Sequence, residues 1–206
     1  RHRRARMSHP SSPLAIGPLS LPNRIVVAPM CQYSSIDGEA TDWHVQHWTT
    51  MALSGAGLVI IEATAVEPRG RISWADLGLY DDATEAAFAN ALATARRWSP
   101  ARIGVQLAHA GRKASTLKPW EAGGGPIPAG DPRGWITRAP SAIPYADSDP
   151  LPEAIDDAGI ADIVQAFVDS ATRAVRLGLD LIELHAAHGY LLHEFLSPLS
   201  NQRTDA

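Results

Sequence analysis

The chain has 206 residues, of which 45% are hydrophobic and 19% are charged, and its formal net charge is −4. This composition is that of a soluble globular protein with one substantial core, and the slightly acidic balance argues against nucleic acid as the main partner. No apolar run approaches the roughly eighteen residues that a membrane span needs. Cys31 is the only cysteine, so an internal disulfide is excluded and a cytoplasmic location is expected.

The first six residues, RHRRAR, are basic but are not followed by the apolar core of a signal peptide. We interpret Met7 as the biological start and the residues before it as upstream or cloning-derived sequence. Residues 1–12 are expected to be disordered or cloning-derived. Residues 13–206 are expected to form one structural unit.

Short apolar runs alternate along the chain with segments of helical character. The predicted order is a strand at 24–30, a helix at 41–55, a strand at 56–66, a helix at 81–98, a strand at 102–110, a helix at 156–178 and a strand at 179–187. Gly55 and Gly178 suit the ends of the first and third helices. Asp82 and Glu85 have capping-box spacing at the start of the second.

The third helix shows the clearest periodicity of the chain. Its apolar residues recur at the spacing of a single helix face: Ile160, Ile163, Val164, Phe167, Ala171, Ala174 and Val175. Strands that alternate with helices in this way pair in parallel, and their nearly continuous apolar character predicts that both faces of the sheet are covered.

Two α/β architectures compete at this point, an open doubly wound sheet and a (β/α)8 TIM barrel. The first strand ends in APMCQYSS, which lacks the G-x-G-x-x-G of an open dinucleotide-binding sheet. Polar residues instead follow all four strands, where barrel enzymes place their chemistry: Cys31, Tyr33, Glu62, Thr64, Gln106, His109, His185 and His188. The sequence therefore predicts a barrel, of which this chain supplies roughly the first four βα units.

A connection of about forty residues, 111–152, separates the third strand from the third helix, and it is rich in Gly and Pro. Such a segment is either a lid over a site or a disordered insertion. Trp120, Trp135 and Tyr145 favour a partly ordered lid.

Strand alternation predicts which side chains point into the barrel. Ile103, Val105 and Leu107 should face the helices, which turns Gln106 inward between Gly104 and Ala108. In the last strand Ile182 and Leu184 should pack outward, with Glu183 and His185 inward. An amide such as Gln106 donates and accepts together, as the edge of a flavin pyrimidine ring requires, although a satisfied interior polar group is the simpler alternative.

His185 and His188 leave three interpretations open. They could belong to a metal site completed by His193 or Glu194, donate two N–H bonds to one substrate oxygen, or be core histidines bonded to backbone. Tyr190 is either a proton donor or a packing aromatic. Cys31 is either a small buried apolar group or a polarisable group beside a cofactor, and Tyr33 is similarly ambiguous.

Several blocks together resemble successive motifs of the old yellow enzyme family, FMN-dependent ene-reductases on a (β/α)8 barrel that oxidise NADPH or NADH. These blocks are NRIVVAPMCQYSS, EATAVEPRGRIS, GVQLAHAGRKA, APSAIP and LIELHAAHGYLLHEFLSPLSNQRTD. The resemblance extends from about Pro13 to Asp205. In having a cysteine directly after APM, the sequence resembles the bacterial class of the family.

The resemblance implies roles for individual residues and no metal. Ala28, Pro29, Met30, Cys31 and Ala63 would contact the flavin, with Gln106 on its pyrimidine edge. His185 and His188 would bind the activating oxygen of an enone, enal or nitroalkene, with Tyr33 shaping that pocket. Tyr190 would protonate the substrate carbon, and His193 would be structural. The reaction would be a ping-pong hydride transfer.

The family's barrel continues for four more strands, which carry the flavin phosphate site. The 206-residue chain is therefore expected to bind FMN poorly by itself. Its open strand edges and apolar helix faces would need a second copy or the remaining half to cover them, so a homo-oligomer is a further expectation. The alternatives are a non-catalytic half-barrel that pairs with a partner chain and, less favoured, a metal hydrolase that uses His185, His188 and His193.

Overall fold

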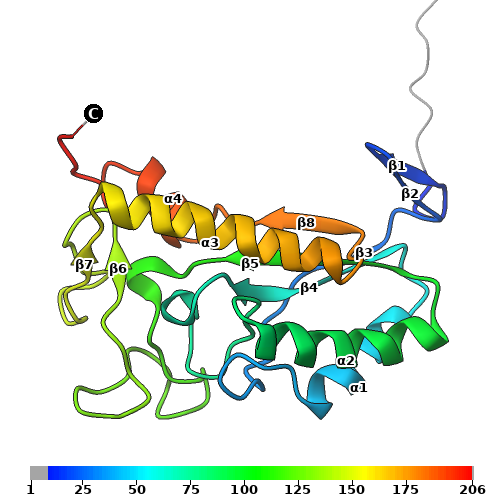
Figure 1. Cartoon of the computed structure of the whole chain (residues 1–206), viewed down its shortest axis with the longest axis horizontal. Helices are drawn as coiled ribbons and strands as arrows, with labels where there is room; N and C mark the ends of the chain where they lie inside the picture. Colours follow the sequence, from blue (N-terminus) through cyan, green and yellow to red (C-terminus); the bar gives the residue numbers. More distant parts are fainter. Residues whose placement is uncertain (1–8, 206) are drawn as a thin grey trace, which may run out of the picture.

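Four parallel strands form the main sheet of the computed structural model, which describes residues 9–205 (Figure 1). Met7 and residues 1–8 of the expected N-terminal segment lie outside the described residues. The strands are β3 (Val26–Val27), β4 (Leu58–Ala65), β5 (Arg102–Ala108) and β8 (Leu181–Leu184), and they lie side by side in that order. Neighbours in the sheet are thus successive barrel strands, as in a barrel wall and unlike a doubly wound sheet.

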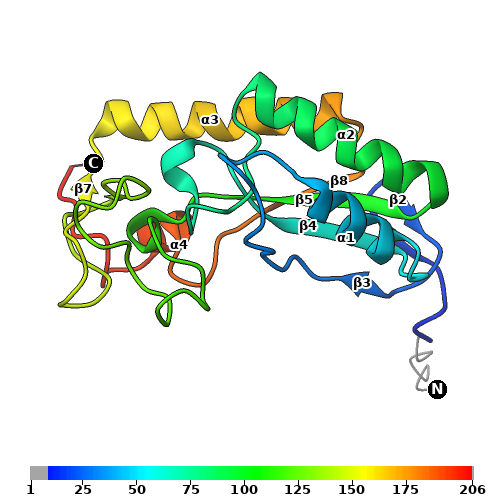
Figure 2. The ribbon, with the colours of Figure 1, turned by 90° about the horizontal axis from the view of Figure 1, so that it is seen from below.

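Three helices connect these strands, and a short fourth helix follows the last one. They are α1 (Asp42–Ala52), α2 (Asp82–Trp98), α3 (Asp157–Arg176) and α4 (Leu191–Leu196). α2 and α3 run along one side of the sheet (Figure 2). Ile103, Val105 and Leu107 are buried in the core that contains α2, which confirms the predicted alternation of β5.

The apolar face of α3 is only partly covered, in agreement with the expectation that a half-barrel leaves apolar helix faces exposed. Ile163 and Ala174 are buried, but Val164 is 58% exposed and Val175 is 68% exposed. Leu184 at the end of β8 was predicted to pack outward against helices and is also exposed.

The predicted capping box of α2 was wrong by one residue. The N-cap is Asp81, whose Oδ1 accepts the Thr84 N–H at 2.8 Å, while the Thr84 hydroxyl accepts the Asp81 N–H at 3.1 Å. Asp81 has the extended backbone that a cap needs, whereas Asp82 is already helical. Glu85 instead binds two arginines of α3.

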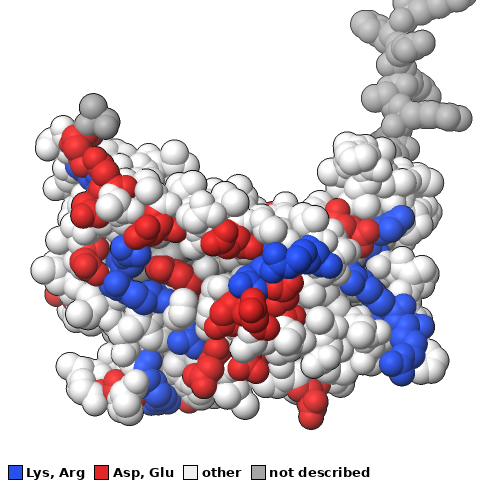
Figure 3. All heavy atoms as spheres, viewed as in Figure 1, with Lys and Arg blue, Asp and Glu red and all other residues white. Residues whose placement is uncertain are grey.

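Charged side chains join α2 to α3 on the face drawn in Figure 3. Arg173 contacts both Asp82 and Glu85, and Arg176 Nη2 lies 2.6 Å from Glu85 Oε2. Basic and acidic groups accordingly lie next to each other on this face (Figure 3).

The capping assignment leads to a direct stability test. Asp81→Ala removes the acceptor for the Thr84 N–H and should destabilise the fold by about 1 kcal/mol. Asp82→Ala is the matched control, because the Asp82 side chain is 96% exposed and its surface ion pair should contribute little. Urea unfolding followed by circular dichroism compares the two variants. A larger loss for Asp82→Ala would contradict the assignment.

A hairpin that the sequence did not predict covers the start of the sheet. It consists of β1 (Leu14–Ile16) and β2 (Leu19–Leu21), and its Leu21 is fully buried against Leu58 and Ile60. It lies at the opposite end of the molecule from the 111–152 segment (Figure 1). The residues on either side of the hairpin are also joined, because the Pro10 carbonyl oxygen accepts the Arg24 N–H at 2.8 Å.

The 111–152 segment has little regular structure but is held by specific contacts. It begins with the 3₁₀ helix η2 (Gly111–Lys113) and contains β6 (Arg138–Ala139), which pairs with β7 (Glu153–Ala154) beyond it. Trp135 Nε1 donates to Arg69 O at 2.9 Å, near the 3₁₀ helix η1 (Pro68–Gly70). In the part of the chain that the structure describes, no helix is long and apolar enough to cross a membrane.

Candidate functional site

Four of the polar residues predicted at the strand ends, Cys31, Gln106, His185 and His188, line one cavity, which we term the strand-end cavity. Its volume is about 290 Å³. The lining consists of Ala28, Pro29, Cys31, Ala63, Ile72, Gln106, His185, His188 and Tyr190. Every predicted site residue except Met30 and Tyr33 is therefore part of this lining, and Ile72 joins them without having been predicted.

Met30 and Tyr33 lie outside that lining. Met30 is 55% exposed. Tyr33 has a left-handed backbone (φ 52°), and its ring packs edge-on against Trp120 with 5.5 Å between centroids. Burial raises the pKa of Tyr33 to about 12. Tyr33 therefore connects the segment after β3 to the 111–152 segment.

A β-bulge at Glu62 sets the inner wall of the cavity. Ile61 pairs with Val105, but the next register pair is Ala63 with Gln106, so Glu62 is the extra residue. The bulge places Ala63 beside Gln106. Gln106 Nε2 donates to Glu183 Oε1 of the neighbouring strand at 2.5 Å, which fixes the amide and confirms that Glu183 points to the same side of the sheet.

Glu62 also holds the turn that carries Cys31. Its Oε2 accepts the Gln32 N–H at 2.7 Å, and its Oε1 lies 3.5 Å from the Nε2 of the fully buried His44. Burial raises the pKa of the Cys31 thiol, and the negative charges of Asp76 and Glu62 raise it further. Cys31 is thus a neutral thiol at physiological pH, and it is not set up as a thiolate nucleophile.

His185, His188 and Tyr190 form a cluster of rings at the end of β8. The centroid of His185 lies 5.0 Å from that of His188 and 4.9 Å from that of Tyr190, each pair edge-on. His188 adopts a left-handed backbone (φ 58°), as does Gly189 after it. This turn reverses the chain and brings the three rings into one cavity.

The protonation of this cluster follows from its contacts. The Ala187 N–H donates to His185 Nδ1 at 3.3 Å, so the neutral ring carries its proton on Nε2. Burial lowers the pKa of His185, and the charge of His188 lowers it further, so the ring is neutral at pH 7. Burial raises the pKa of Tyr190, which keeps the phenol protonated.

Lys113 is a member of the site that sequence reasoning missed. Its Nζ donates to His188 O at 2.8 Å and lies 5.1 Å from the ring centroid of Tyr190. Asp76, whose charge raises the pKa of the Cys31 thiol, was missed as well. It is 1% exposed, and burial raises its pKa to about 7. The only sequence signal for Lys113 was its place in the segment that follows β5, and Asp76 gave none.

His193 and Glu194, considered above as further metal ligands, are used elsewhere. His193 Nδ1 accepts the Gly189 N–H at 2.8 Å and closes the turn after His188. Glu194 is 1% exposed, and its Oε1 accepts the Arg112 N–H at 2.9 Å. Among residues 9–205, no three His, Cys, Asp or Glu side chains are grouped so that they could hold a metal ion.

Residues 11–206 match the model of the NADH:flavin oxidoreductase / NADH oxidase family. An NADH:flavin oxidoreductase from Gibberella zeae is 46% identical over 197 residues, which are 94% of this chain and 47% of that protein. An NADPH dehydrogenase from Geobacillus thermodenitrificans is 46% identical over 196 residues, 94% of this chain and 52% of its own length. The chain thus spans about half the length of these relatives.

Solved structures show the same relationship. Morphinone reductase superposes with a TM-score of 0.81 at 30% identity, covering 98% of this chain and 54% of that one. Old yellow enzyme from Pichia sp. superposes with a TM-score of 0.80 at 26% identity, over 95% of this chain and 50% of that one. These likenesses confirm the predicted partial (β/α)8 barrel.

Proposed function

Because this chain belongs to the NADH:flavin oxidoreductase / NADH oxidase family, we propose that it supplies the substrate-binding half of an FMN-dependent oxidoreductase. The enzyme would use NADPH or NADH to reduce activated C=C bonds of enones, enals or nitroalkenes. One observation carries this proposal. His185, His188 and Tyr190 line the same cavity as Gln106, Ala63 and Cys31. Two N–H donors for a substrate oxygen, a proton donor and a surface for a flat ring therefore lie together.

The floor of the cavity fits the flavin ring. Ala28 and Ala63 present only methyl groups, Cys31 presents a neutral thiol, and the Gln106 amide can both donate and accept at a pyrimidine edge. FMN would therefore be held by residues 28–31, Ala63 and Gln106. When bound, it supplies a ring that takes a hydride from the nicotinamide and passes one to the substrate.

The remaining residues would act on the substrate. His185 and His188 would each donate an N–H to its carbonyl or nitro oxygen, which stabilises the negative charge that develops there as the alkene is reduced. Tyr190 would then give its phenolic proton to the neighbouring carbon. Its raised pKa suits a donor that must remain protonated until that step.

Histidine variants test these roles. His185→Ala and His188→Ala should each slow flavin reoxidation by cyclohexenone about 10²–10³-fold, the cost of removing one oxyanion donor. Flavin reduction by NADPH should be nearly unchanged. Anaerobic stopped-flow absorbance separates the two half-reactions, and His188→Gln, which retains an N–H donor, should recover part of the rate. Equal losses in both half-reactions would contradict the assigned role.

A second candidate function rests on the exposed apolar surface. Ile25 beside β3 and Leu184 at the end of β8 are 52% and 58% exposed, and Val164, Val168 and Val175 of α3 are exposed as well. β3 and β8 are the two edge strands of the sheet, and the valines belong to the uncovered face of α3. On this proposal the chain is a non-catalytic half-barrel that pairs with a partner chain or a second copy.

The two candidates differ in what added FMN does. In the first, the chain combined with a complementary half, for example residues of the Geobacillus thermodenitrificans relative beyond those matched by this chain, retains FMN through desalting, and NADPH bleaches and cyclohexenone restores the flavin absorbance. In the second, the two halves associate, but the desalted complex retains no flavin that NADPH reduces. Light scattering before and after the complementary half is added measures the association.

A further inference from the structure

The Glu183 side chain bonds to one residue in the part of the chain that the structure describes, and that residue is Gln106. The two residues lie directly opposite each other in the register between β5 and β8. Gln106 Nε2 donates to Glu183 Oε1 at 2.5 Å. Within residues 9–205 neither side chain makes a second hydrogen bond. The carboxylate of Glu183 therefore acts on the amide of Gln106 alone.

Glu183 determines which way the Gln106 amide faces. A primary amide can exchange the places of its oxygen and nitrogen by a half-turn, and each orientation can form hydrogen bonds. An ionised carboxylate, by contrast, accepts hydrogen bonds and donates none. The favourable orientation is therefore the one with Nε2 toward Glu183. A hydrogen bond to a charged acceptor is stronger than one between neutral groups, so this orientation is firmly held.

This orientation leaves Gln106 Oε1 open to the strand-end cavity. Gln106 lines that cavity and is half-buried. Its Oε1 accepts no hydrogen bond from residues 9–205 and does not belong to the buried unpaired atoms, so a molecule in the cavity can reach it. An accessible acceptor beside the second N–H of Nε2 matches a ring edge on which an N–H lies next to a carbonyl.

We propose that Glu183 is a positioning residue for the flavin: by fixing the Gln106 amide, it makes the strand-end cavity select a ring with a free imide N–H. This inference rests on the proposed function, in which Gln106 bonds the pyrimidine edge of FMN. Gln106 Oε1 would accept the ring N3–H, and Nε2 would donate to a neighbouring carbonyl. A ring that is methylated at N3 has no such donor and would leave Oε1 unpaired.

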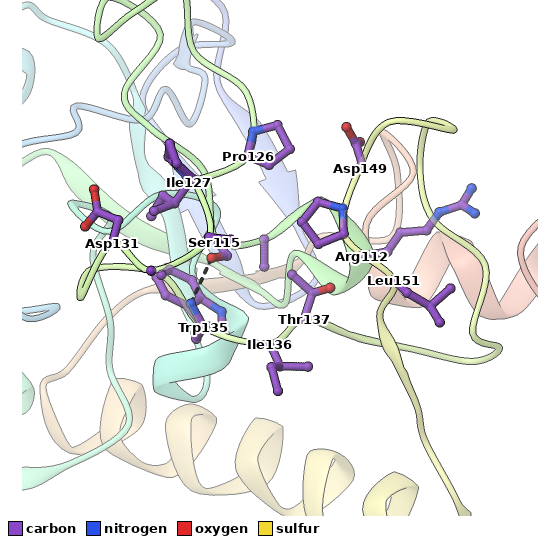
Figure 4. Close-up of a pocket in the computed structure, with 16 residues that line it drawn as sticks. Arg112, Ser115, Pro126, Ile127, Asp131, Trp135, Ile136, Thr137, Asp149 and Leu151 are labelled. Carbon is purple, nitrogen blue, oxygen red and sulfur yellow. Dashed lines mark hydrogen bonds between the residues drawn. The ribbon is translucent and has the colours of Figure 1, made fainter.

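A second cavity of the same volume is an alternative place for a ring to bind. We term it the loop cavity, because every residue that lines it falls between Arg112 and Leu151. Its volume, about 290 Å³, equals that of the strand-end cavity. Figure 4 shows Ile127 and Leu151 on opposite sides of it, and the two cavities share no lining residue. Leu151 is 64% exposed, so it can be replaced without disturbing the core.

The first measurement needs no flavin. In the ¹⁵N-labelled 206-residue chain, the side-chain NH₂ signals of Gln106 are assigned by NMR from their loss in Gln106→Met. Glu183→Leu should make these protons exchange with solvent about 10-fold faster, as expected for one lost hydrogen bond. Glu183→Gln, which retains an acceptor, should give an intermediate rate. Unchanged exchange in Glu183→Leu would overturn the proposal.

The second measurement compares lumiflavin with 3-methyllumiflavin, each titrated against the same signals. Neither compound carries a phosphate, so binding needs only a site for the ring. The natural chain should bind lumiflavin about 10-fold more tightly, the factor expected for one hydrogen bond. Glu183→Leu should reduce this ratio to about 3-fold or less, because the freed amide can turn and donate to a carbonyl of the methylated ring. Leu151→Asp should leave the ratio unchanged.

The possible outcomes separate this inference from the proposed function. Equal affinities of the natural chain for the two flavins, or a ratio that Glu183→Leu leaves unchanged, would overturn the role of Glu183. Loss of binding in Leu151→Asp would place the ring in the loop cavity and overturn it as well. If Glu183→Leu speeds the Gln106 exchange but neither flavin binds, the proposed function fails, and Glu183 orients the amide for a purpose other than flavin binding.

Discussion

Gly111→Ala is expected to destabilise the fold by at least about 3 kcal/mol, a loss that only a collision or strain in a packed region produces. Gly111 opens η2 with φ +62°, a backbone conformation that side chains rarely adopt. A Cβ there would stand 2.2 Å from Glu194 Oε1 and 2.6 Å from its carboxyl carbon. Glu194 is buried and bonded to the Arg112 N–H, so it has no room to withdraw.

Gly55→Ala separates the two causes of this loss. Gly55 has φ +85°, but a Cβ at this position would meet nothing within 4 Å. Gly55→Ala should therefore lower the free energy of unfolding by about 1–2 kcal/mol, the cost of placing a Cβ on a left-handed backbone. Urea unfolding of both variants, followed by circular dichroism, gives the comparison. Equal losses would show that Glu194 does not resist the added methyl group.

The packing beneath η2 also bears on the site, because η2 carries Lys113. Lys113 Nζ bonds to His188 O and lies over the Tyr190 ring. A shift of η2 would therefore move a positive charge relative to both rings. Gly111→Ala should reduce the order of the strand-end cavity even where the fold survives.

The strands and their inner faces could be predicted because those features are local. β5 has large apolar residues at every second position and small or polar residues between them. Because side chains alternate between the two faces of a strand, only the apolar face can pack against α2. Gln106 and His185 followed from that alternation. Their common cavity followed from the rule that parallel strands end at one edge of the sheet.

Features that depend on contacts between distant segments could not be predicted. The bulge at Glu62 depends on the register between β4 and β5, and the sequence of β4 carries no sign of it. Lys113 reaches His188 across 75 residues of chain. The periodicity of α3 showed an apolar face, but which of its residues are covered depends on neighbours, so the burial of Ile163 and the exposure of Val164 could not be assigned from the sequence.

The Glu194→Gln variant is expected to lose much less stability than the natural chain as the pH rises from 4 to 9. Burial raises the pKa of Glu194 to about 8, above its ordinary value of 4.5, and Oε2 has no partner among residues 9–205. The folded chain thus binds this proton more tightly than the unfolded chain does. The resulting stability is fully present below pH 4.5, falls as the pH rises, and is lost above pH 8.

Glutamine has no such titration, and its Oε1 can still accept the Arg112 N–H. The variant should therefore match the natural chain near pH 4 and be more stable at pH 9 by an amount on the order of 3 kcal/mol. Urea unfolding at both pH values gives this difference, and other titrating groups, including Asp76, cancel from it.

Glu153→Gln is the control of opposite sign. Arg69 beside Glu153 lowers the pKa of that carboxyl, so its contribution is present above the ordinary pKa and is lost as the pH falls. The natural chain should be slightly the more stable of the two at pH 9, and the difference should vanish in acid. A Glu194→Gln difference that stayed constant from pH 4 to pH 9 would mean that Glu194 titrates alike in both states. Gly111 would then face an ordinary carboxylate that water reaches, and Gly111→Ala would destabilise the fold by less than about 3 kcal/mol.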